Sequence, residues 1–547
     1  MASDRSLSVW CRPHGPRAAV QTVAVALVVM LFAVACGSSG TPSDFADVEQ
    51  EPASAPTATT PYESTASPSE QPAHTATPVP GVAIDGGVAS WFTPRLEDDP
   101  RCPALANAEV TCHRLYVAAD RDDPTGGIVS LPVVTVHHAG PDTPGDALIA
   151  PAGGPGGGQV EYGPRSDFPP LFERDAVFYD QRGVGLATPK LDCAAGDEAI
   201  LSALDTTDGY EVERALFRDA FAACADEFTS SGVDLTDYNS IASAHDLEDL
   251  RIALGYERWT MIGVSYGARL TLTTIREYPE SVRAVVLDSV FDVTYDGLGE
   301  AFNDADRALS ALVEACAASE PCAARGDLGE TIEQMRTDYN EDPLDIEATV
   351  IGERRSLKVT GDDLITAIFF AMYDTAGLST LPVNIERISE REEAIVKRLI
   401  RPAAEIPFSQ SELMGYAVIC SDHAELDLGA TNRAALEDPG RWSTRAAFGF
   451  MCPPDWPAAA PDYNEPVLSD LPALILAGAY DPVTLPGPTL ALAERFPNST
   501  VALHPAGGHG VFHTHPCLLL LTRTFITDPS SALDTSCVDD LDQLRPD

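Results

Sequence analysis

The sequence predicts an α/β fold in which a mainly parallel sheet is interrupted by an inserted, mostly helical segment. Between residues 127 and 291, short apolar runs alternate with amphipathic helical runs, which is the pattern of strands and crossover helices. Residues 295–455 break this alternation because they are helical in pattern, and strand-like runs return at 471–482 and 499–510. The inserted block is therefore expected to form a cap over the carboxyl ends of the strands.

The elements before the insertion can be assigned one by one. Short runs rich in β-branched residues predict buried strands at 127–138, 146–151 and 175–180. A helix is expected at 240–255, with Asn239 or Ser240 as its N-cap and Gly255 just past its end. The series closes with a strand, a helix and a strand at 259–265, 267–279 and 282–291.

Residues 1–35 have the form of an export signal, in which three arginines precede an apolar run. The run ends in Ala-Val-Ala before Cys36, which resembles the bacterial lipobox, a motif whose cysteine is lipidated. The lipobox usually has Leu three residues before the cysteine, where this chain has Ala33. The same residues also fit ordinary cleavage and secretion, or an uncleaved membrane anchor. We expect a cell-membrane lipoprotein attached through Cys36, and either alternative also places the globular part outside the cytoplasm.

The rest of the chain divides by composition. Residues 36–85 are rich in Ser, Thr, Pro and Ala and hold few large apolar residues, so they predict a flexible tether. The first part of the core is expected at 86–294, the cap at 295–455, and the C-terminal part of the core at 456–547.

Charge limits the classes of partner. The chain has 35 basic and 83 acidic residues, a net charge of −48. Such a surface repels the phosphates of nucleic acids and anionic lipid headgroups, so we expect no nucleic-acid partner and membrane contact only through a lipid or signal anchor. Solubility outside the cell explains the acidity better than attraction of a cationic ligand, because salt screens surface charges over about 10 Å.

The cysteines after Cys36 are even in number and none has the CxxC spacing of a zinc site. In an exported protein this pattern predicts disulfides. Pairing of nearest neighbours is the simplest connectivity: Cys102–Cys112, Cys193–Cys224, Cys316–Cys322, Cys420–Cys452 and Cys517–Cys537.

Residues 263–267, Gly-Val-Ser-Tyr-Gly, lie between a predicted strand and a predicted helix. G-x-S-x-G in this context is typical of a nucleophile elbow, a tight turn that exposes the serine hydroxyl above the sheet edge. We therefore expect Ser265 to be a nucleophile. An aspartate at this position would have indicated dehalogenase or epoxide hydrolase chemistry instead.

A serine hydroxyl needs a base, and the base needs a group that orients it. Asp481 follows the apolar run "LPALILAGAY", and His509 follows "STVALHPAGG". Both are therefore expected on loops at the carboxyl ends of strands, in the order nucleophile, acid, base that accompanies this elbow. The sequence predicts a triad of Ser265, His509 and Asp481.

Acyl transfer also needs N–H donors for the oxyanion. The N–H of Tyr266, at the start of the helix after the elbow, is one expected donor. The second should come from the loop "PAGGPGGG" (151–158), which follows the predicted strand "DALIA". Gly153 is the first choice there and Gly154 the second.

The segments "GGPGGG", "YDQRGVG", "GVSYG", "AGAYDP" and "GGHG" occur in an order that resembles the proline iminopeptidase and tripeptidyl aminopeptidase family of α/β-hydrolases. The resemblance covers about residues 90–545 and includes a TAP-like C-terminal segment. It implies an α/β-hydrolase fold with a cap and the same triad, without a cofactor. Ala152 departs from the HGGPG of many iminopeptidases, which suggests the tripeptidyl-like branch. In "YDQRGVG", Asp180 and Arg182 are expected to be structural and paired.

Family members that act on peptide N-termini bind the ammonium group through acidic side chains, some of them from the cap. Asp422 and Glu425 are the candidates that this resemblance suggests here. His509, His513 and His515 lie close together in the sequence, but no pattern of acidic ligands accompanies them and His509 is needed as the base. We therefore expect no metal site.

The sequence thus predicts an exported serine peptidase that releases residues or short peptides from free N-termini. A carboxylesterase with the same triad is the nearest alternative. A catalytically inactive surface binding protein is a third possibility, and the presence of every expected catalytic group argues against it.

Overall fold

The structure is a computed structural model that describes residues 92–106, 108–123, 127–139, 145–165, 171–203, 205, 207, 210–295, 297–350, 353–405, 410–423, 452 and 456–546. The predicted signal segment, the tether and Cys36 lie outside these residues, as does Glu425. Within the described part of the chain, no helix combines the length and the hydropathy needed to cross a membrane.

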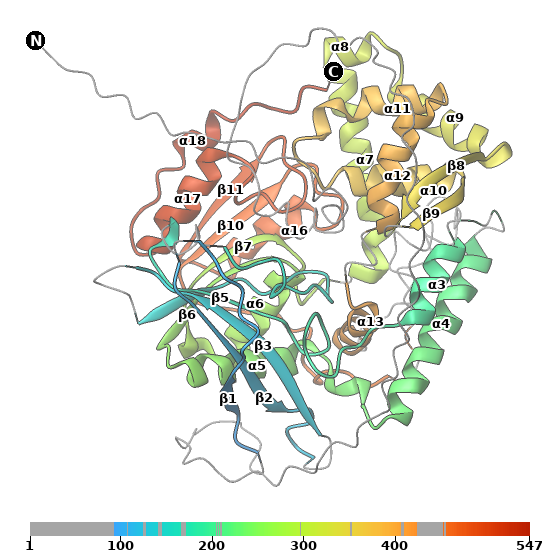
Figure 1. The fold of residues 1–547 in the computed structure, drawn as a ribbon. Coiled ribbons are helices and arrows are strands. Elements are labelled where there is room, and N and C mark those ends of the chain that lie inside the picture. Colours follow the sequence, from blue (N-terminus) through green and yellow to red (C-terminus); the bar gives the residue numbers. More distant parts are fainter. Residues whose placement is uncertain are drawn as a thin grey trace, which may run out of the picture.

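A nine-stranded sheet forms the centre of the fold, in the order β1-β2-β3-β5-β4-β6-β7-β10-β11 (Figure 1). The three pairings from β1 to β5 are antiparallel, whereas β5, β4, β6, β7, β10 and β11 run parallel. The strands are β1 (Arg95–Asp98), β2 (Val110–Ala118), β3 (Ile128–Val136), β4 (Asp146–Ile149), β5 (Ala176–Tyr179), β6 (Arg258–Ser265), β7 (Val282–Val290), β10 (Ala473–Gly478) and β11 (Ser499–His504).

The expected mainly parallel α/β sheet is confirmed. Each strand-like run of the sequence analysis contains one strand, because these runs are apolar enough to be buried on both faces of a covered sheet. All residues of β4, β5 and β10 are buried. The antiparallel strands β1 and β2 were not predicted from the sequence.

Two layers of helices cover the sheet. On one face, α17 (Pro516–Thr527) packs Leu518, Leu521 and Phe525 against strand residues that include Ile262 and Leu474. On the other face lie α5 (Ser240–Leu254) and α6 (Tyr266–Glu277). Shorter elements complete the core: α16 (Pro486–Ala491), α18 (Ser536–Asp539), η1 (Leu235–Asp237), η2 (Pro279–Ser281) and η5 (Leu492–Glu494).

Helix α5 shows how local sequence sets an element boundary. The Asn239 side chain accepts a hydrogen bond from the N–H of Ala242, which makes Asn239 the N-cap. At the other end Gly255 has a φ of 81°, a left-handed conformation that glycine adopts without strain. The predicted helix and its caps are confirmed.

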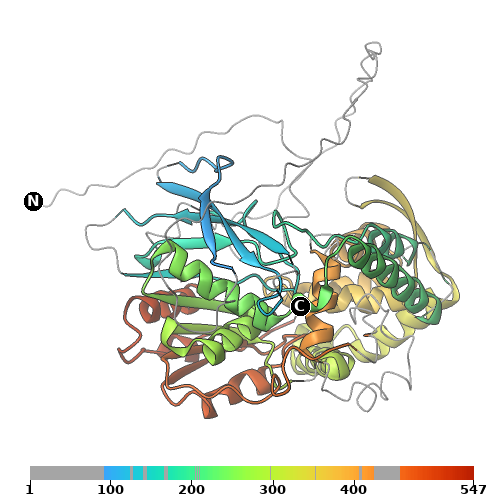
Figure 2. The same cartoon turned by 90° about the horizontal axis from the view of Figure 1, so that it is seen from below.

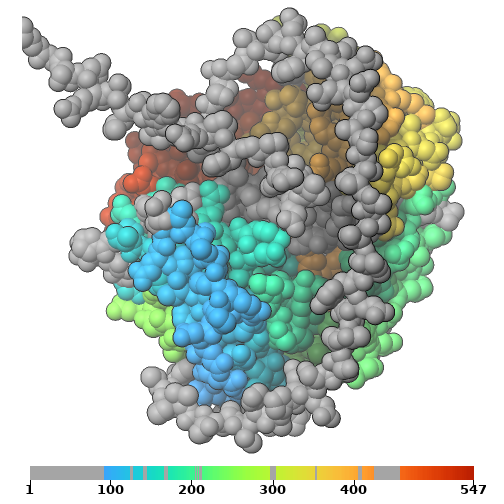
Figure 3. Space-filling model, viewed as in Figure 1, coloured from blue at the N-terminus to red at the C-terminus, as the bar shows by residue number. Residues whose placement is uncertain are grey.

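The insertion between β7 and β10 forms a separate lobe beside the sheet (Figures 1 and 2). It also contains the antiparallel hairpin of β8 (Leu344–Val350) and β9 (Glu353–Val359), which was not predicted. In the space-filling view, β1 and β2 (blue) lie on one side of the molecule, and the yellow and orange part of the insertion lies on the other side (Figure 3). Its helices are α7 (Gly297–Ala318), α8 (Glu320–Ala323), α9 (Leu328–Glu341), α10 (Gly361–Ala371), η3 (Leu378–Thr380), α11 (Leu381–Ser389), α12 (Glu393–Glu405) and α13 (Glu412–Asp422).

Two helices from the first part of the chain lie on the cap side as well. Helices α3 (Ala194–Ala203) and α4 (Tyr210–Ser230) stand beside the insertion rather than against the sheet (Figures 1 and 2). The rings of Phe221 in α4 and Tyr416 in α13 stack with centroids 5.4 Å apart. The cap is therefore built from two separate stretches of sequence.

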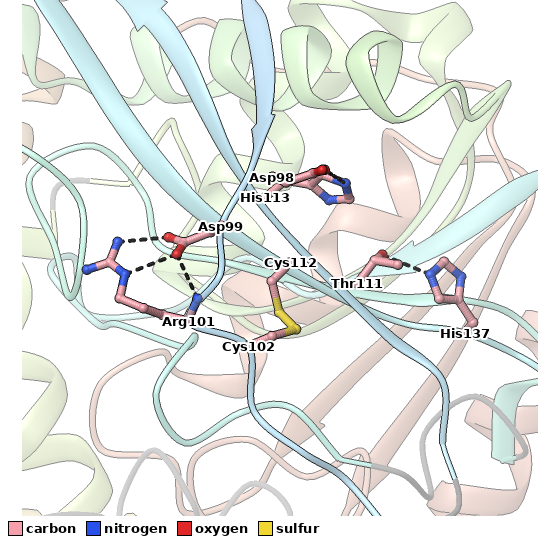
Figure 4. Close-up of a disulfide and its surroundings, with 8 residues drawn as sticks. All are labelled: Asp98, Asp99, Arg101, Cys102, Thr111, Cys112, His113 and His137. Carbon is pink, nitrogen blue, oxygen red and sulfur yellow. Dashed lines mark hydrogen bonds and ion pairs between the residues drawn. A yellow bond between two sulfur atoms is a disulfide. The ribbon is translucent and has the colours of Figure 1, made fainter.

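All five predicted disulfides are confirmed, with nearest-neighbour connectivity. The Cys102–Cys112 bridge fastens the segment after β1 to β2 (Figure 4). Beside it, Asp99 accepts hydrogen bonds from the Arg101 side chain at 2.8 and 3.0 Å. Chiefly because of these bonds, the pKa of Asp99 lies well below its usual range.

Candidate active site

Ser265 occupies the sharp turn between β6 and α6. Its backbone has φ 59° and ψ −126°, a conformation that residues with a side chain rarely adopt. Such strain persists only where the surroundings enforce it, and it is concentrated at functional sites. The turn places the serine at the carboxyl edge of the parallel strands, as expected of a nucleophile elbow.

The two glycines of the motif are required by close packing. A Cβ on Gly263 would lie 2.6 Å from the Cα of Ala268, and one on Gly267 would lie 2.3 Å from the carbonyl oxygen of Pro151. Neither backbone atom can move without distorting the turn. The glycines therefore allow the strand, the helix and the loop at 151–158 to meet around the serine.

The loop at 151–158 lies beside Ser265. A Cβ on Gly153 would be 3.6 Å from the Cβ of Ser265. Gly154 has a φ of +119° and a Cβ there would lie 2.8 Å from the N of Gly156, so this part of the loop is tightly folded. Tyr266 is the first residue of α6, where an N–H has no acceptor within the helix. Gly153 and Tyr266, two of the groups expected to form the oxyanion hole, thus lie beside Ser265, and Gly154 follows Gly153 in the loop.

The "YDQRGVG" segment braces that loop. Asp180 accepts hydrogen bonds from the N–H groups of Gln159, Val160 and Leu186 at 2.6 to 2.9 Å. The amide of Gln181 donates to the carbonyl of Ala152 at 3.0 Å. These bonds fix both ends of the glycine loop.

The expected pairing of Asp180 with Arg182 is wrong. Arg182 is fully buried and forms two hydrogen bonds to Asp246 of α5, at 2.7 and 2.8 Å. Its remaining donors bind backbone carbonyls that include those of Ala119 and Asp237. Arg182 is structural, as predicted, but its partner Asp246 lies on α5, 64 residues further along the chain, and no local pattern links the two residues.

Asp481 and His509 come together beyond the ends of β10 and β11. Asp481 Oδ2 lies 2.9 Å from His509 Nδ1, and the Asp481 side chain is fully buried. The other oxygen of Asp481 accepts the N–H groups of Val483 and Thr484, both at 2.9 Å. A carboxylate held in this way orients an imidazole with its Nδ1 proton toward Asp481, which leaves Nε2 free to act as a base.

Thr484 is a member of the site that the sequence analysis missed. Its hydroxyl donates to Asp481 Oδ2 at 2.8 Å and lies 3.3 Å from His509 Nδ1. The only signal in the sequence is its position three residues after Asp481, where a hydroxyl can reach a carboxylate in a turn.

The electrostatics favour a basic imidazole. Burial lowers the pKa of His509, but the charge and hydrogen bond of Asp481 and the charge of Asp288 outweigh burial, and the pKa is raised. Among the hydrogen bonds of the described residues, none joins Ser265 Oγ to the His509 ring. Catalytic hydrogen bonds of this kind are often long before substrate binds.

Strand β7 connects the two halves of the site. The N–H of Phe291, just after β7, donates to the carbonyl of Ser265 at 3.4 Å. Two residues earlier, within β7, the hydroxyl of Ser289 accepts the N–H of Gly510 at 2.8 Å. Ser265 and the histidine loop are therefore both hydrogen-bonded to the end of this one strand.

Asp422 is placed away from a role in binding substrate. Its side chain is fully buried and pairs with Arg269 of α6 at 3.1 Å. It also accepts the Ser240 N–H at 3.2 Å and the Tyr463 hydroxyl at 3.0 Å, and it binds the Ser240 hydroxyl at 2.5 Å. Because its oxygens are already occupied, we treat Asp422 as structural; Glu425 lies outside the described residues.

The neighbouring histidines do not converge with His509 on a common point. His515 caps α17, where its Nδ1 accepts the N–H of Cys517 at 3.2 Å. The ring of His513 packs beside that of Phe512, with centroids 4.7 Å apart. In the part of the chain that the structure describes, no three His, Cys, Asp or Glu residues are grouped to hold a metal ion.

Comparison with known proteins identifies relatives over most of the chain. Residues 146–317 match the family described as alpha/beta hydrolase fold, and residues 442–537 match the TAP-like protein family. The chain is 25% identical to serine protease Hip1 of Mycobacterium tuberculosis H37Rv, over 82% of this chain and 91% of that protein. It is also 25% identical to tripeptidyl aminopeptidase of Streptomyces coelicolor, over 78% and 83% of the two chains.

A solved structure of proline iminopeptidase from Mycobacterium smegmatis aligns with 73% of this chain and 95% of its own, at 14% identity and a TM-score of 0.35. The two family matches, the parallel sheet and the two peptidase relatives agree with one another. The chain is therefore a serine hydrolase with the α/β-hydrolase fold, and it is similar to peptidases of that fold and, over residues 442–537, to the TAP-like protein family.

Proposed function

We propose that this protein is an exported peptidase that removes residues or short peptides from free N-termini, with Ser265, His509 and Asp481 as its triad. The contact of Asp481 Oδ2 with His509 Nδ1, at the sheet edge where Ser265 adopts its strained turn, carries this proposal. A free N-terminus as the recognition element is supported by the similarity to tripeptidyl aminopeptidases.

The reaction follows from the roles of these groups. The Ser265 hydroxyl attacks the carbonyl carbon while its proton passes to His509 Nε2. The N–H groups of Tyr266 and of Gly153 or Gly154 stabilise the oxyanion. His509 then protonates the leaving amine, the C–N bond breaks, and an acyl-enzyme remains on Ser265. Water, deprotonated by His509, hydrolyses the ester and releases the N-terminal fragment.

Export is supported by the disulfides, which persist in oxidising compartments. Within that proposal, Cys36 is the lipidation site and residues 36–85 hold the enzyme at a distance from the membrane. Replacement of Cys36 by Ala in the native host should release active enzyme into the medium if a lipid is the anchor. Retention of the Cys36→Ala protein in the membrane fraction would show that the apolar run before Cys36 can itself serve as an anchor, and absence of a fatty-acid label on the wild-type chain would contradict lipid anchoring.

Two experiments test the proposed activity. A fluorophosphonate probe should label the purified wild-type protein and fail to label Ser265→Ala, which should also lose peptidase activity. Tripeptidyl and aminoacyl anilides should be cleaved when their N-terminus is free and spared when it is acetylated. Cleavage of acyl esters with no cleavage of either anilide would show a carboxylesterase, and absence of labelling would indicate an inactive binding protein.

A further inference from the structure

The backbone around His509 is held from outside its own loop to an unusual extent. Five consecutive N–H groups, from Gly508 to Phe512, each donate to an acceptor on another element. A loop of this kind would ordinarily leave several N–H groups to water. The acceptors are Thr375 Oγ1 (3.0 Å), the Tyr373 carbonyl (3.1 Å), Ser289 Oγ (2.8 Å) and, for two N–H groups, Asp288 Oδ2 (2.7 Å each).

The end of β7 supplies the acceptors on the core side. Asp288 and Ser289 are both fully buried, and the Ser289 hydroxyl lies 3.2 Å from Asp288 Oδ1. Ser289 has a φ of 51°, in the left-handed region that costs a residue with a side chain about 1 kcal/mol or more. In this conformation the Ser289 hydroxyl accepts the hydrogen bond from the N–H of Gly510.

The segment that follows α10 supplies the acceptors on the cap side, Tyr373 and Thr375. The Tyr373 ring meets the His509 ring edge-on, with centroids 5.0 Å apart. Gly508 approaches this segment so closely that a Cβ there would lie 2.4 Å from the carbonyl oxygen of Met372. The cap is thus in direct contact with the histidine loop.

We propose that Asp288 is a positioning residue for His509, acting on the imidazole through the loop backbone and through its own charge, with Thr375 of the cap as the second support. This inference rests on the proposed function, because it presumes His509 to be the base. Catalytic geometry tolerates little displacement: a shift of about 1 Å can cost about 100-fold in rate. A base carried on a loop therefore gains from a backbone fixed at five successive positions.

The charge of Asp288 adds an effect that a purely mechanical support would lack. Burial raises the pKa of Asp288 to about 7, against the opposing influence of the Phe512 and Val511 N–H groups and of His509. Its charge in turn helps to raise the pKa of His509. The other titratable groups facing the imidazole are Asp481, after β10, and the Tyr373 ring, just after α10.

Two substitutions of Asp288 distinguish the effect of its charge from the effect of its hydrogen bonds to the loop. Asp288→Asn is nearly isosteric and keeps a carbonyl oxygen for the N–H groups of Val511 and Phe512, but it removes the charge. Asp288→Ala removes both. We expect Asp288→Ala to lower kcat about 100-fold with KM changed less than about 3-fold. Asp288→Asn should retain kcat near neutral pH and move the acid limb of the pH profile of kcat/KM to lower pH.

Thr375→Val tests the cap side, since it removes only the acceptor of the Gly508 N–H. It should lower kcat by less than Asp288→Ala does and leave the pH profile in place. Asp175→Asn is the matched control. Asp175 is buried and accepts the His138 N–H at 2.8 Å and the Tyr256 hydroxyl at 2.7 Å. It lies just before the amino end of β5, whereas His509 lies beyond the carboxyl ends of the parallel strands.

The measurements are kcat, KM and the pH profile of anilide cleavage by the purified exported chain. An unmoved acid limb in Asp288→Asn, or a shift equal to that of Asp175→Asn, would overturn the charge effect. Unchanged kcat in Asp288→Ala would overturn the positioning role. If Asp288→Ala does not fold, Asp288→Asn decides the charge effect, and Thr375→Val decides the positioning role, because unchanged kcat in that variant would overturn it. Fluorophosphonate labelling of wild-type Ser265 is scored separately, so failure of the triad itself remains distinguishable.

Discussion

Arg269 and Asp422 form an ion pair of 3.1 Å in which neither side chain is exposed to solvent. The pair joins α6, which begins directly after Ser265, to the last residue of α13. Arg269 also donates to the carbonyl of Asp292 at 2.8 Å and lies over the Phe291 ring at 5.0 Å. Loss of Asp422 would leave a guanidinium buried without its counter-charge.

We therefore expect Asp422→Ala to lower the free energy of unfolding by about 3–5 kcal/mol, as measured by urea denaturation. The matched control is Asp345→Ala, whose partner Lys358 is exposed and whose loss should cost at most about 1 kcal/mol. If Asp422 instead bound the substrate ammonium, its loss would raise KM for free N-termini while stability stayed near that of the wild type.

The second prediction concerns the elbow. Gly267→Ala should disturb the turn, because the new Cβ would lie 2.3 Å from the Pro151 carbonyl oxygen. The expected result is loss of fluorophosphonate labelling together with a lower melting temperature. Gly487→Ala in α16 is the control, since no atom lies within 4 Å of the added Cβ. Normal labelling of Gly267→Ala would show that the loop and the helix can separate without harm.

The third prediction concerns Asp481. Asp481→Asn keeps the shape of the side chain but allows the amide to hold His509 in the wrong tautomer. In serine hydrolases with this arrangement such a change lowers kcat by about 10⁴-fold. We expect a loss of this order in anilide cleavage with little change in KM. A loss below about 10-fold would indicate that another group, Asp288 foremost, orients the imidazole.

The fourth prediction is the pH dependence of the wild-type enzyme. The base must be neutral to accept a proton, and the net effect of Asp481 and Asp288 raises the pKa of His509 above its ordinary 6.5. The value of kcat/KM should therefore rise with pH along an acid limb whose midpoint lies above 6.5. Stopped assays across pH 5 to 9 measure it, and a midpoint below that value would contradict the electrostatic account.

The fifth prediction concerns the disulfide at the base of α3 and α4. Cys193 and Cys224 are 31 residues apart in sequence, so their bridge closes a long loop and lowers the conformational entropy of the unfolded chain. Replacement of both by Ser should cost about 2–4 kcal/mol. Chemical denaturation of the double variant beside the wild type measures it, with the Cys316–Cys322 pair, separated by 6 residues, as a short-loop comparison.

The features that could be predicted from the sequence depend on interactions between residues that are close together in the chain. The caps of α5 follow from Asn239 and Gly255, each of which acts within its own turn. The parallel strands follow from apolar runs, and the elbow follows from two glycines that flank a serine. The disulfides could be paired because each cysteine has one near neighbour in the sequence.

What escaped prediction depends on contacts between distant segments. Asp422 looked like a free acid of the cap, but its partner Arg269 lies 153 residues away in sequence, and no periodicity links them. Asp288 lies two residues before the end of β7 in the run "VVLDSV", and a carboxylate in so apolar a run is a signal in the sequence that its side chain has buried partners. Hairpin β8–β9 was obscured because its exposed positions carry charged residues that also suit a helix.

The two-part origin of the cap has a consequence for protein engineering. Exchange of residues 295–455 with the corresponding insertion of a relative would leave α4 in place, and its Phe221 ring would lose the Tyr416 ring on which it stacks. Hybrids made in this way should aggregate unless the donor also supplies its version of residues 194–230. Recombination of specificity within this group of enzymes therefore requires two segments to be exchanged together, one on each side of Ser265 in the sequence.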